Sequence, residues 1–152
     1  MARHRSIFSL VLVLLATFLI SCSGPSVTVA PPTYTATQLE RIQEYIPKIQ
    51  AVRDRSDELK TLIKKQDWID VDNFIHGPMT EARSSMTYII PNLLPSAQPI
   101  ARQKTRDLLN DLVKLDQAAV QSNTQLALSS YQEAMEDIDQ FFQLLPDTNP
   151  QA

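Results

Sequence analysis

After residue 37 the chain contains a single glycine, Gly77, and its apolar side chains recur three or four residues apart over long stretches. That spacing places apolar side chains on one side of an α-helix, whereas a half-buried strand requires strict alternation. Four such stretches follow one another, separated by short turns or a proline-rich connector. The pattern therefore predicts an all-α protein folded as an antiparallel, up-down-up-down four-helix bundle. In this arrangement each helix buries its stripe of apolar side chains against the other three.

The first stretch begins at Thr37, which we expect to cap the helix together with Glu40, three residues later. Pro47 lies inside this stretch. An internal proline removes one backbone donor and clashes with the preceding turn. We therefore expect a kink or a break near Tyr45, with regular helix from about Pro47 to Lys65.

The second stretch begins after Asp67, a favourable N-cap for Trp68, and ends before Pro91. Gly77-Pro78 lies inside it. At this dipeptide we expect a bend, or else a short helix that ends at residue 76 and a second helix that opens with Pro78 in its first turn.

Prolines at positions 91, 95 and 99 form a connector to the third stretch, which ends near Gln121. The apolar positions of this stretch are Ile100, Leu108, Leu112, Leu115 and Ala118 or Ala119, with Leu109 and Val113 widening the stripe. The fourth stretch follows Ser122-Asn123 and ends before Pro146. The bundle is thus expected over residues 37–146, followed by a flexible tail at 147–152.

The N-terminus has the features of a bacterial lipoprotein signal. Basic residues at positions 3 and 5 precede an apolar run, Ile7–Ile20, which is shorter than the roughly 20 residues of a membrane-spanning helix. The run ends in Leu19-Ile20-Ser21-Cys22, a lipobox that contains the chain's only cysteine. We expect residues 1–21 to be removed and Cys22 to carry acyl chains such as palmitate. An ordinary secretory signal or an uncleaved anchor is the alternative, and either would still export the chain.

Residues 22–36 are rich in Ser, Thr, Pro and Val and carry no charge, so we expect an extended, lipidated tether. Cleavage would remove two arginines and no carboxylate, leaving 12 basic and 17 acidic side chains, a net charge of −5. This balance argues against a nucleic-acid partner and against electrostatic binding to anionic lipid. Membrane affinity would come from the acyl chains.

Few side chains of the mature chain suggest chemistry. His76 is its sole histidine, no thiol remains once Cys22 is acylated, and no Gly-x-Ser-x-Gly motif occurs, so we expect no enzyme and no cofactor. His76 and Asp72 are the candidate ligands for a metal such as zinc, but two are too few, and a third would have to come from another segment. We therefore assign no metal site.

Trp68 is interpreted as the aromatic residue that closes one end of the core. Arg83 either pairs with a carboxylate of the bundle or contacts a partner, and the sequence leaves both open. The run from Trp68 to Met79, WIDVDNFIHGPM, is followed by Arg83 and Met86. Together with the lipobox and the tether it resembles the cyanobacterial, lipid-anchored form of the PsbQ family, with Met79 where leucine is expected.

This resemblance covers the whole mature chain, and its motif residues are Trp68, Gly77, Pro78 and Arg83. It implies a non-enzymatic subunit of photosystem II, lipid-anchored on the lumenal side of the thylakoid membrane, that stabilises the oxygen-evolving assembly. The partners it implies are the core antenna and the manganese-stabilising extrinsic protein, and the family is also associated with calcium ion binding. The alternative is a periplasmic helical lipoprotein that acts as a chaperone or a metal buffer.

Overall fold

The structure, a computed structural model, describes residues 33–147, and every regular element in this range is helical. The predicted signal peptide, Cys22, most of the tether and residues 148–152 lie outside the described residues. The elements in chain order are α2 (Ala36–Asp54), α3 (Ser56–Lys65), α4 (Trp68–Phe74), the π-helix η1 (Ile75–Met79), α5 (Thr80–Ile89), the 3₁₀-helix η2 (Ile90–Asn92), α6 (Gln98–Val120) and α7 (Thr124–Phe142).

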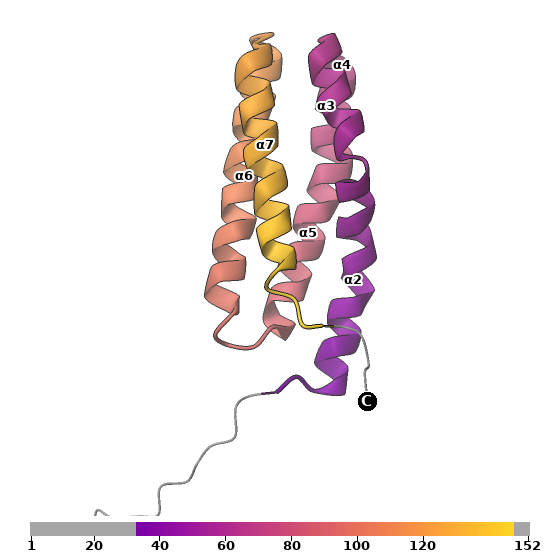
Figure 1. Cartoon of the computed structure of the whole chain (residues 1–152), viewed down its shortest axis with the longest axis vertical. Helices are drawn as coiled ribbons and strands as arrows, with labels where there is room; N and C mark the ends of the chain where they lie inside the picture. The colour runs from indigo at the N-terminus through magenta and orange to yellow at the C-terminus, as the bar shows by residue number, and fades with distance from the viewer. Residues whose placement is uncertain (1–32, 148–152) are drawn as a thin grey trace, which may run out of the picture. The chain divides into compact units, whose positions relative to one another are not determined.

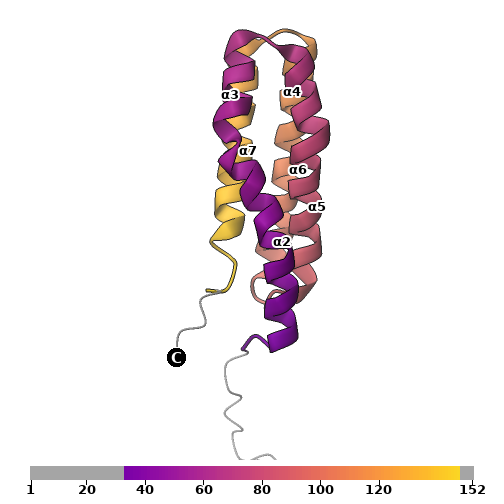
Figure 2. The same ribbon diagram turned by 90° about the vertical axis from the view of Figure 1, so that its right-hand side faces the viewer.

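These elements form four antiparallel rods. The first rod is α2 with α3, the second is α4, η1 and α5 in one continuous run, and α6 and α7 are the third and fourth (Figure 1). Turned by 90°, the second rod lies beside α6 and runs the opposite way (Figure 2). The predicted all-α, up-down-up-down four-helix bundle is therefore confirmed. None of the described helices combines the length and the apolar character that a membrane span requires.

The first rod differs from the sequence-based expectation in two places. Its N-cap is Thr35, not Thr37: the Thr35 hydroxyl accepts a hydrogen bond from the Gln38 backbone N–H, and the Gln38 side chain accepts one from the Thr35 N–H. Two overlapping capping boxes are present in this stretch, Thr35 with Gln38 and Thr37 with Glu40, and the earlier one is used.

The expected break near Tyr45 is also wrong. α2 continues through Pro47, whose side chain is exposed, and ends seven residues later at Asp54, with Arg55 as its C-cap. The regular helix expected from about Pro47 to Lys65 is therefore interrupted at Arg55. The start of α3 is supported by charge, because Asp57 and Glu58 lie in its first turn and lysines occupy its last turn. This order of charges complements the helix dipole and favours a separate helix after Arg55.

The second rod begins as predicted, with the Asp67 carboxylate accepting a hydrogen bond from the Asp70 backbone N–H. It does not end at residue 76. Instead the turn around Gly77-Pro78 widens into η1, which accommodates a residue without an N–H donor inside a continuous helix. The Thr80 hydroxyl donates to the carbonyl oxygen of Ile75 across this widened turn, at 3.1 Å.

The turn between the third and fourth rods lies at Ser122-Asn123, where the sequence predicts it. Ser122 adopts the left-handed conformation with φ 52°, and the Asn123 side chain accepts a hydrogen bond from the Leu126 N–H at 3.1 Å. α7 ends at Phe142, four residues before Pro146.

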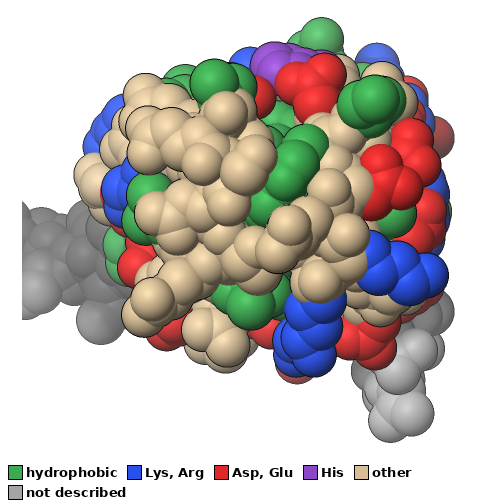
Figure 3. Space-filling model, turned by 90° about the horizontal axis from the view of Figure 1, so that it is seen from above, with side chains coloured by type: hydrophobic (Ala, Val, Ile, Leu, Met, Phe, Trp, Pro, Cys, Tyr) green, Lys and Arg blue, Asp and Glu red, His purple; other side chains and the backbone are tan. Residues whose placement is uncertain are grey.

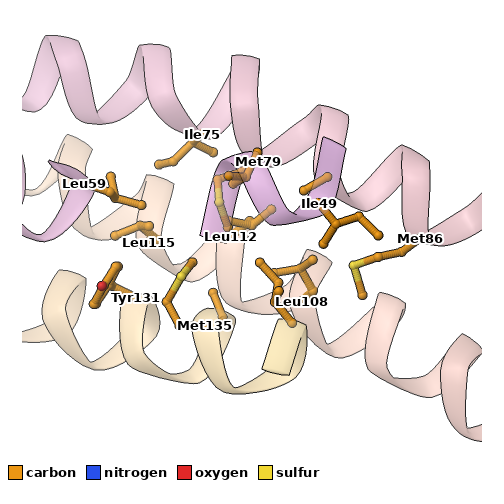
Figure 4. Close-up of a cluster of buried hydrophobic side chains, with 14 of the residues drawn as sticks. Ile49, Leu59, Ile75, Met79, Met86, Leu108, Leu112, Leu115, Tyr131 and Met135 are labelled. Atoms are coloured by element: carbon orange, nitrogen blue, oxygen red, sulfur yellow. The ribbon is translucent and has the colours of Figure 1, made fainter. Parts of the chain in front are cut away.

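The core runs along the common axis of the four rods and is built from aliphatic, methionine and aromatic side chains (Figure 4). Its central members, contributed by every rod, are Ile49, Leu59, Ile75, Met79, Met86, Leu108, Leu112, Leu115, Tyr131 and Met135. Three apolar positions expected on the stripe of α6 are instead exposed, namely Ile100, Leu109 and Val113. Leu109 and Val113 lie on the side of α6 next to the second rod, outside the buried core.

Candidate functional site

The residues of the family-like motif lie along the second rod. Trp68, the first residue of α4, is partly buried and packs against the core at the end of the bundle where α3 meets α4 (Figure 1). Gly77 is exposed, its φ is not positive, and an added Cβ would meet no atom within 4 Å. The fold within the described residues therefore does not itself require glycine at this position.

Two candidate metal ligands on this rod are joined by a third residue from α6. The His76 Nε2 atom lies 3.4 Å from the Asp72 carboxylate and 3.7 Å from the Asp116 carboxylate. One ligand atom from each of these residues lies within 4.8 Å of the other two. Seen from the end of the bundle where α4 begins, an imidazole lies at the surface beside acidic side chains, with hydrophobic side chains exposed on either side (Figure 3).

This arrangement supplies the third ligand that the sequence alone could not identify. An imidazole and two carboxylates suit a borderline cation such as zinc, with water completing the four-coordinate shell of such an ion. Each of the three side chains is at least one-third exposed, so solvent competes for the same positions.

Next to this cluster, a hollow of about 130 Å³ opens between the second rod and α6. Its walls include Arg83 and Thr80 on one side and Leu109 and Val113 on the other. Leu109 is 42% and Val113 is 47% exposed. The hollow therefore places aliphatic side chains at the surface beside a guanidinium group.

The arginines of the bundle divide into two groups. Arg41, Arg53 and Arg55 each form an ion pair with a carboxylate, and Arg53 binds both oxygens of Asp139. Within residues 33–147, Arg83, Arg102 and Arg106 have no carboxylate within 4.0 Å. Arg102 donates to the Gln98 side chain at 2.8 Å, and Arg106 donates to the Gln103 side chain at 2.6 Å.

A polar groove separates α6 and α7 on another side of the bundle. Lys104, Asp111, Lys114 and Glu133 line it, and Lys114 bridges Asp111 and Glu133. Asp137 lies at its base with a side chain that is only 9% exposed. Burial raises the pKa of Asp137 to about 6, although Lys104, 3.3 Å away, acts in the opposite direction.

Sequence reasoning did not predict the place of Asp116 beside His76, the burial of Asp137 or the Arg102–Arg106 pair. Asp137 lies on the inner side of α7, one position before the buried Ile138. This burial could have been inferred from the sequence, because a carboxylate beside the predicted apolar stripe of a helix is expected to be partly buried. Arg102 and Arg106 are four residues apart and could have been read as neighbours on one side of a helix.

Comparison with known proteins places the chain in a family. It matches the family model PsbQ, described as oxygen evolving enhancer protein 3, over residues 2–146. It is 40% identical over 147 residues to CyanoQ of Synechocystis sp., an alignment that covers 96% of this chain and 98% of that protein. With the bundle, the capped second rod and a match over almost its whole length, the chain belongs to the PsbQ family.

Proposed function

We propose that this protein is a non-enzymatic accessory subunit of photosystem II, anchored by a lipid at Cys22 to the lumenal side of the thylakoid membrane. The observation that carries the proposal is the match to an oxygen-evolving-enhancer family across residues 2–146. The 40% identity to CyanoQ over nearly the full length of both chains supports the same assignment.

The bundle suits a subunit that acts by binding alone. Its core is densely populated by fully buried side chains from all four rods, so the domain presents a rigid surface to a partner. A protein that binds only the assembled form of a complex stabilises that form by mass action, by about 2.7 kcal/mol when its free concentration is 100 times its Kd. No catalytic step and no cofactor is needed for this role.

The partners that we propose are the lumenal parts of the core antenna and the manganese-stabilising extrinsic protein. A tethered domain docks onto such neighbours at a raised effective concentration, because the lipid confines it to the membrane surface. Calcium and zinc are not assigned to the proposed role. The Asp72, His76 and Asp116 cluster is the feature that a metal-buffer function would use instead.

The lipid anchor is tested with Cys22→Ser, and Ser23→Ala, one residue further on, is the matched control because it leaves the lipobox cysteine in place. After a mild salt wash we expect Cys22→Ser in the soluble fraction and the control in the membrane fraction, because acyl chains provide most of the membrane affinity. The measurement is an immunoblot of both fractions, in cells with and without assembled photosystem II. Retention of Cys22→Ser in cells that lack photosystem II would contradict a lipid anchor.

The accessory role is tested by deleting the gene and measuring oxygen evolution per photosystem II. We expect the complex to lose activity faster under illumination than in the parent strain, with recovery on re-expression of the chain. Unchanged activity and unchanged stability of the assembly would instead favour the alternative, a helical lipoprotein that acts as a chaperone or a metal buffer.

A further inference from the structure

One side of the bundle carries cationic and aliphatic side chains together. Around α6, Arg102, Arg106, Leu109 and Val113 fall within roughly 60° of one another at 3.6 residues per turn. Leu109 and Val113 line the hollow together with Arg83 of α5. We call these five residues the arginine face.

The charges of this face are not compensated by the bundle. All 17 acidic residues of the chain lie within residues 33–147, against 12 basic ones, so carboxylates are in excess. Even so, none of them lies within 4.0 Å of the three arginines in this range. Asp116 lines the hollow beside Arg83, but its ion-pair partner is His76. Arg102 and Arg106 each donate one hydrogen bond to a glutamine side chain, and their remaining guanidinium N–H groups are available to a carboxylate.

The apolar part of the face is similarly left without a partner inside the described bundle. Leu109 and Val113 are almost half exposed, one turn apart, with the hollow of about 130 Å³ at their side. Two exposed aliphatic residues next to a recess form a small apolar centre, bordered by Arg83 at the hollow and by Arg106 and then Arg102 further along α6. This is the layout of a protein–protein interface, in which an apolar centre is bordered by polar contacts.

We propose that the arginine face docks on a protein surface that presents carboxylates around an apolar side chain. The inference rests on the proposed function, in which that surface belongs to a lumenal subunit of photosystem II. The arginines would bind the carboxylates in pairs of hydrogen bonds, and the apolar side chain of the partner would enter the hollow.

The identity of the cations favours a protein partner over a lipid surface. All three cations of the face are arginine, and the six lysines of the described chain lie elsewhere. Arginine is enriched in protein interfaces and lysine is depleted. Attraction to anionic lipid typically uses clusters of four to eight basic residues, and this face has three on a chain with a net negative charge.

The test uses the full chain in mild detergent and photosystem II purified from a strain that lacks it. The face variant is Arg102→Glu with Arg106→Glu. The matched control is Lys60→Glu with Lys64→Glu on α3, which has the same spacing of four residues and the same change in charge. A second variant, Leu109→Ala with Val113→Ala, removes apolar contact at exposed positions and leaves the charge unchanged. Circular dichroism confirms that each variant is folded.

We expect the charge-reversal variant to raise the Kd for photosystem II by at least about tenfold, the apolar variant to raise it several-fold, and the control to stay within about twofold. Equal binding by the wild type and both face variants would overturn the inference and leave the proposed function standing. Failure of the wild type to bind photosystem II would overturn both.

Two further outcomes would also overturn the inference by assigning another occupant to the face. The first is self-association of the wild type in sedimentation equilibrium that the charge-reversal variant abolishes. The second is an effect of that variant on binding to phosphatidylglycerol vesicles without any effect on binding to photosystem II.

Discussion

Asp137 makes the stability of the bundle depend on pH in a direction that is unusual for a carboxylate. Its side chain is 9% exposed, and its Oδ2 atom has no hydrogen-bond partner among the described residues. Burial raises its pKa from 3.8 to about 6, against the opposing effect of Lys104 and with repulsion from Asp111 and Asp107. Because the folded state holds this proton more tightly than the unfolded state, the stability from this group is present at low pH and is lost as pH rises through about 6.

The size of the effect follows from the two pKa values. The carboxyl group has a pKa of about 6 in the folded state and 3.8 in the unfolded state. Lowering the pH from 7.5 to 4.5 therefore increases the free energy of unfolding by about 2 kcal/mol through this group. Asp137→Asn removes this titration and retains a carbonyl oxygen for Lys104. The wild type gains this stability on acidification and the variant does not. We therefore expect the free energy of unfolding of the variant minus that of the wild type to be about 2 kcal/mol larger at pH 7.5 than at pH 4.5, so that the variant is relatively more stable at the higher pH.

The assay is urea denaturation followed by circular dichroism at several pH values, with the midpoint and the slope fitted separately. Glu136→Gln is the control, because it removes the same charge from the neighbouring, exposed position of α7. A difference between Asp137→Asn and the wild type that does not change with pH would contradict a raised pKa at Asp137. So would an equal pH dependence of the Glu136→Gln control.

Two further predictions concern stability. Leu115 is fully buried, so Leu115→Ala should lower the free energy of unfolding by about 2–5 kcal/mol. Leu126 is 40% exposed, so Leu126→Ala should lower it clearly less. Urea denaturation of both variants measures the two losses, and equal losses would contradict the described core. Gln66 adopts a left-handed conformation with φ 59° at the end of α3. Gln66→Gly should therefore raise the stability by about 0.5–1 kcal/mol in the same assay, and a loss would contradict strain at this position.

Much of the fold is readable from the sequence because it depends on local patterns. The spacing of apolar residues identifies the four rods, and Asp67 and Asn123 cap their helices through side chains only three residues from the groups they bind. The errors arise where two local signals compete. Thr35 and Thr37 offer overlapping capping boxes, and Pro47 lies inside a stretch whose apolar spacing otherwise favours helix, which continues through it.

The candidate sites are less predictable, because they depend on which rods become neighbours. Asp72 and His76 are four residues apart, and their proximity can be inferred from the helix alone. Asp116 joins them only because α6 packs beside the second rod, 40 residues further along the chain. Leu109 and Val113 looked like a wider stripe of core residues, but the width of a buried stripe is set by the neighbouring rods and not by the helix itself.

Affinity purification is the direct test of whether this chain is an accessory subunit of photosystem II. The chain is tagged at its C-terminus, the membranes are gently solubilised, and the proteins recovered with it are identified by mass spectrometry. We expect photosystem II that evolves oxygen, together with its lumenal extrinsic subunits. Recovery of unrelated envelope proteins, or of no partner, would contradict the claim and favour a periplasmic lipoprotein.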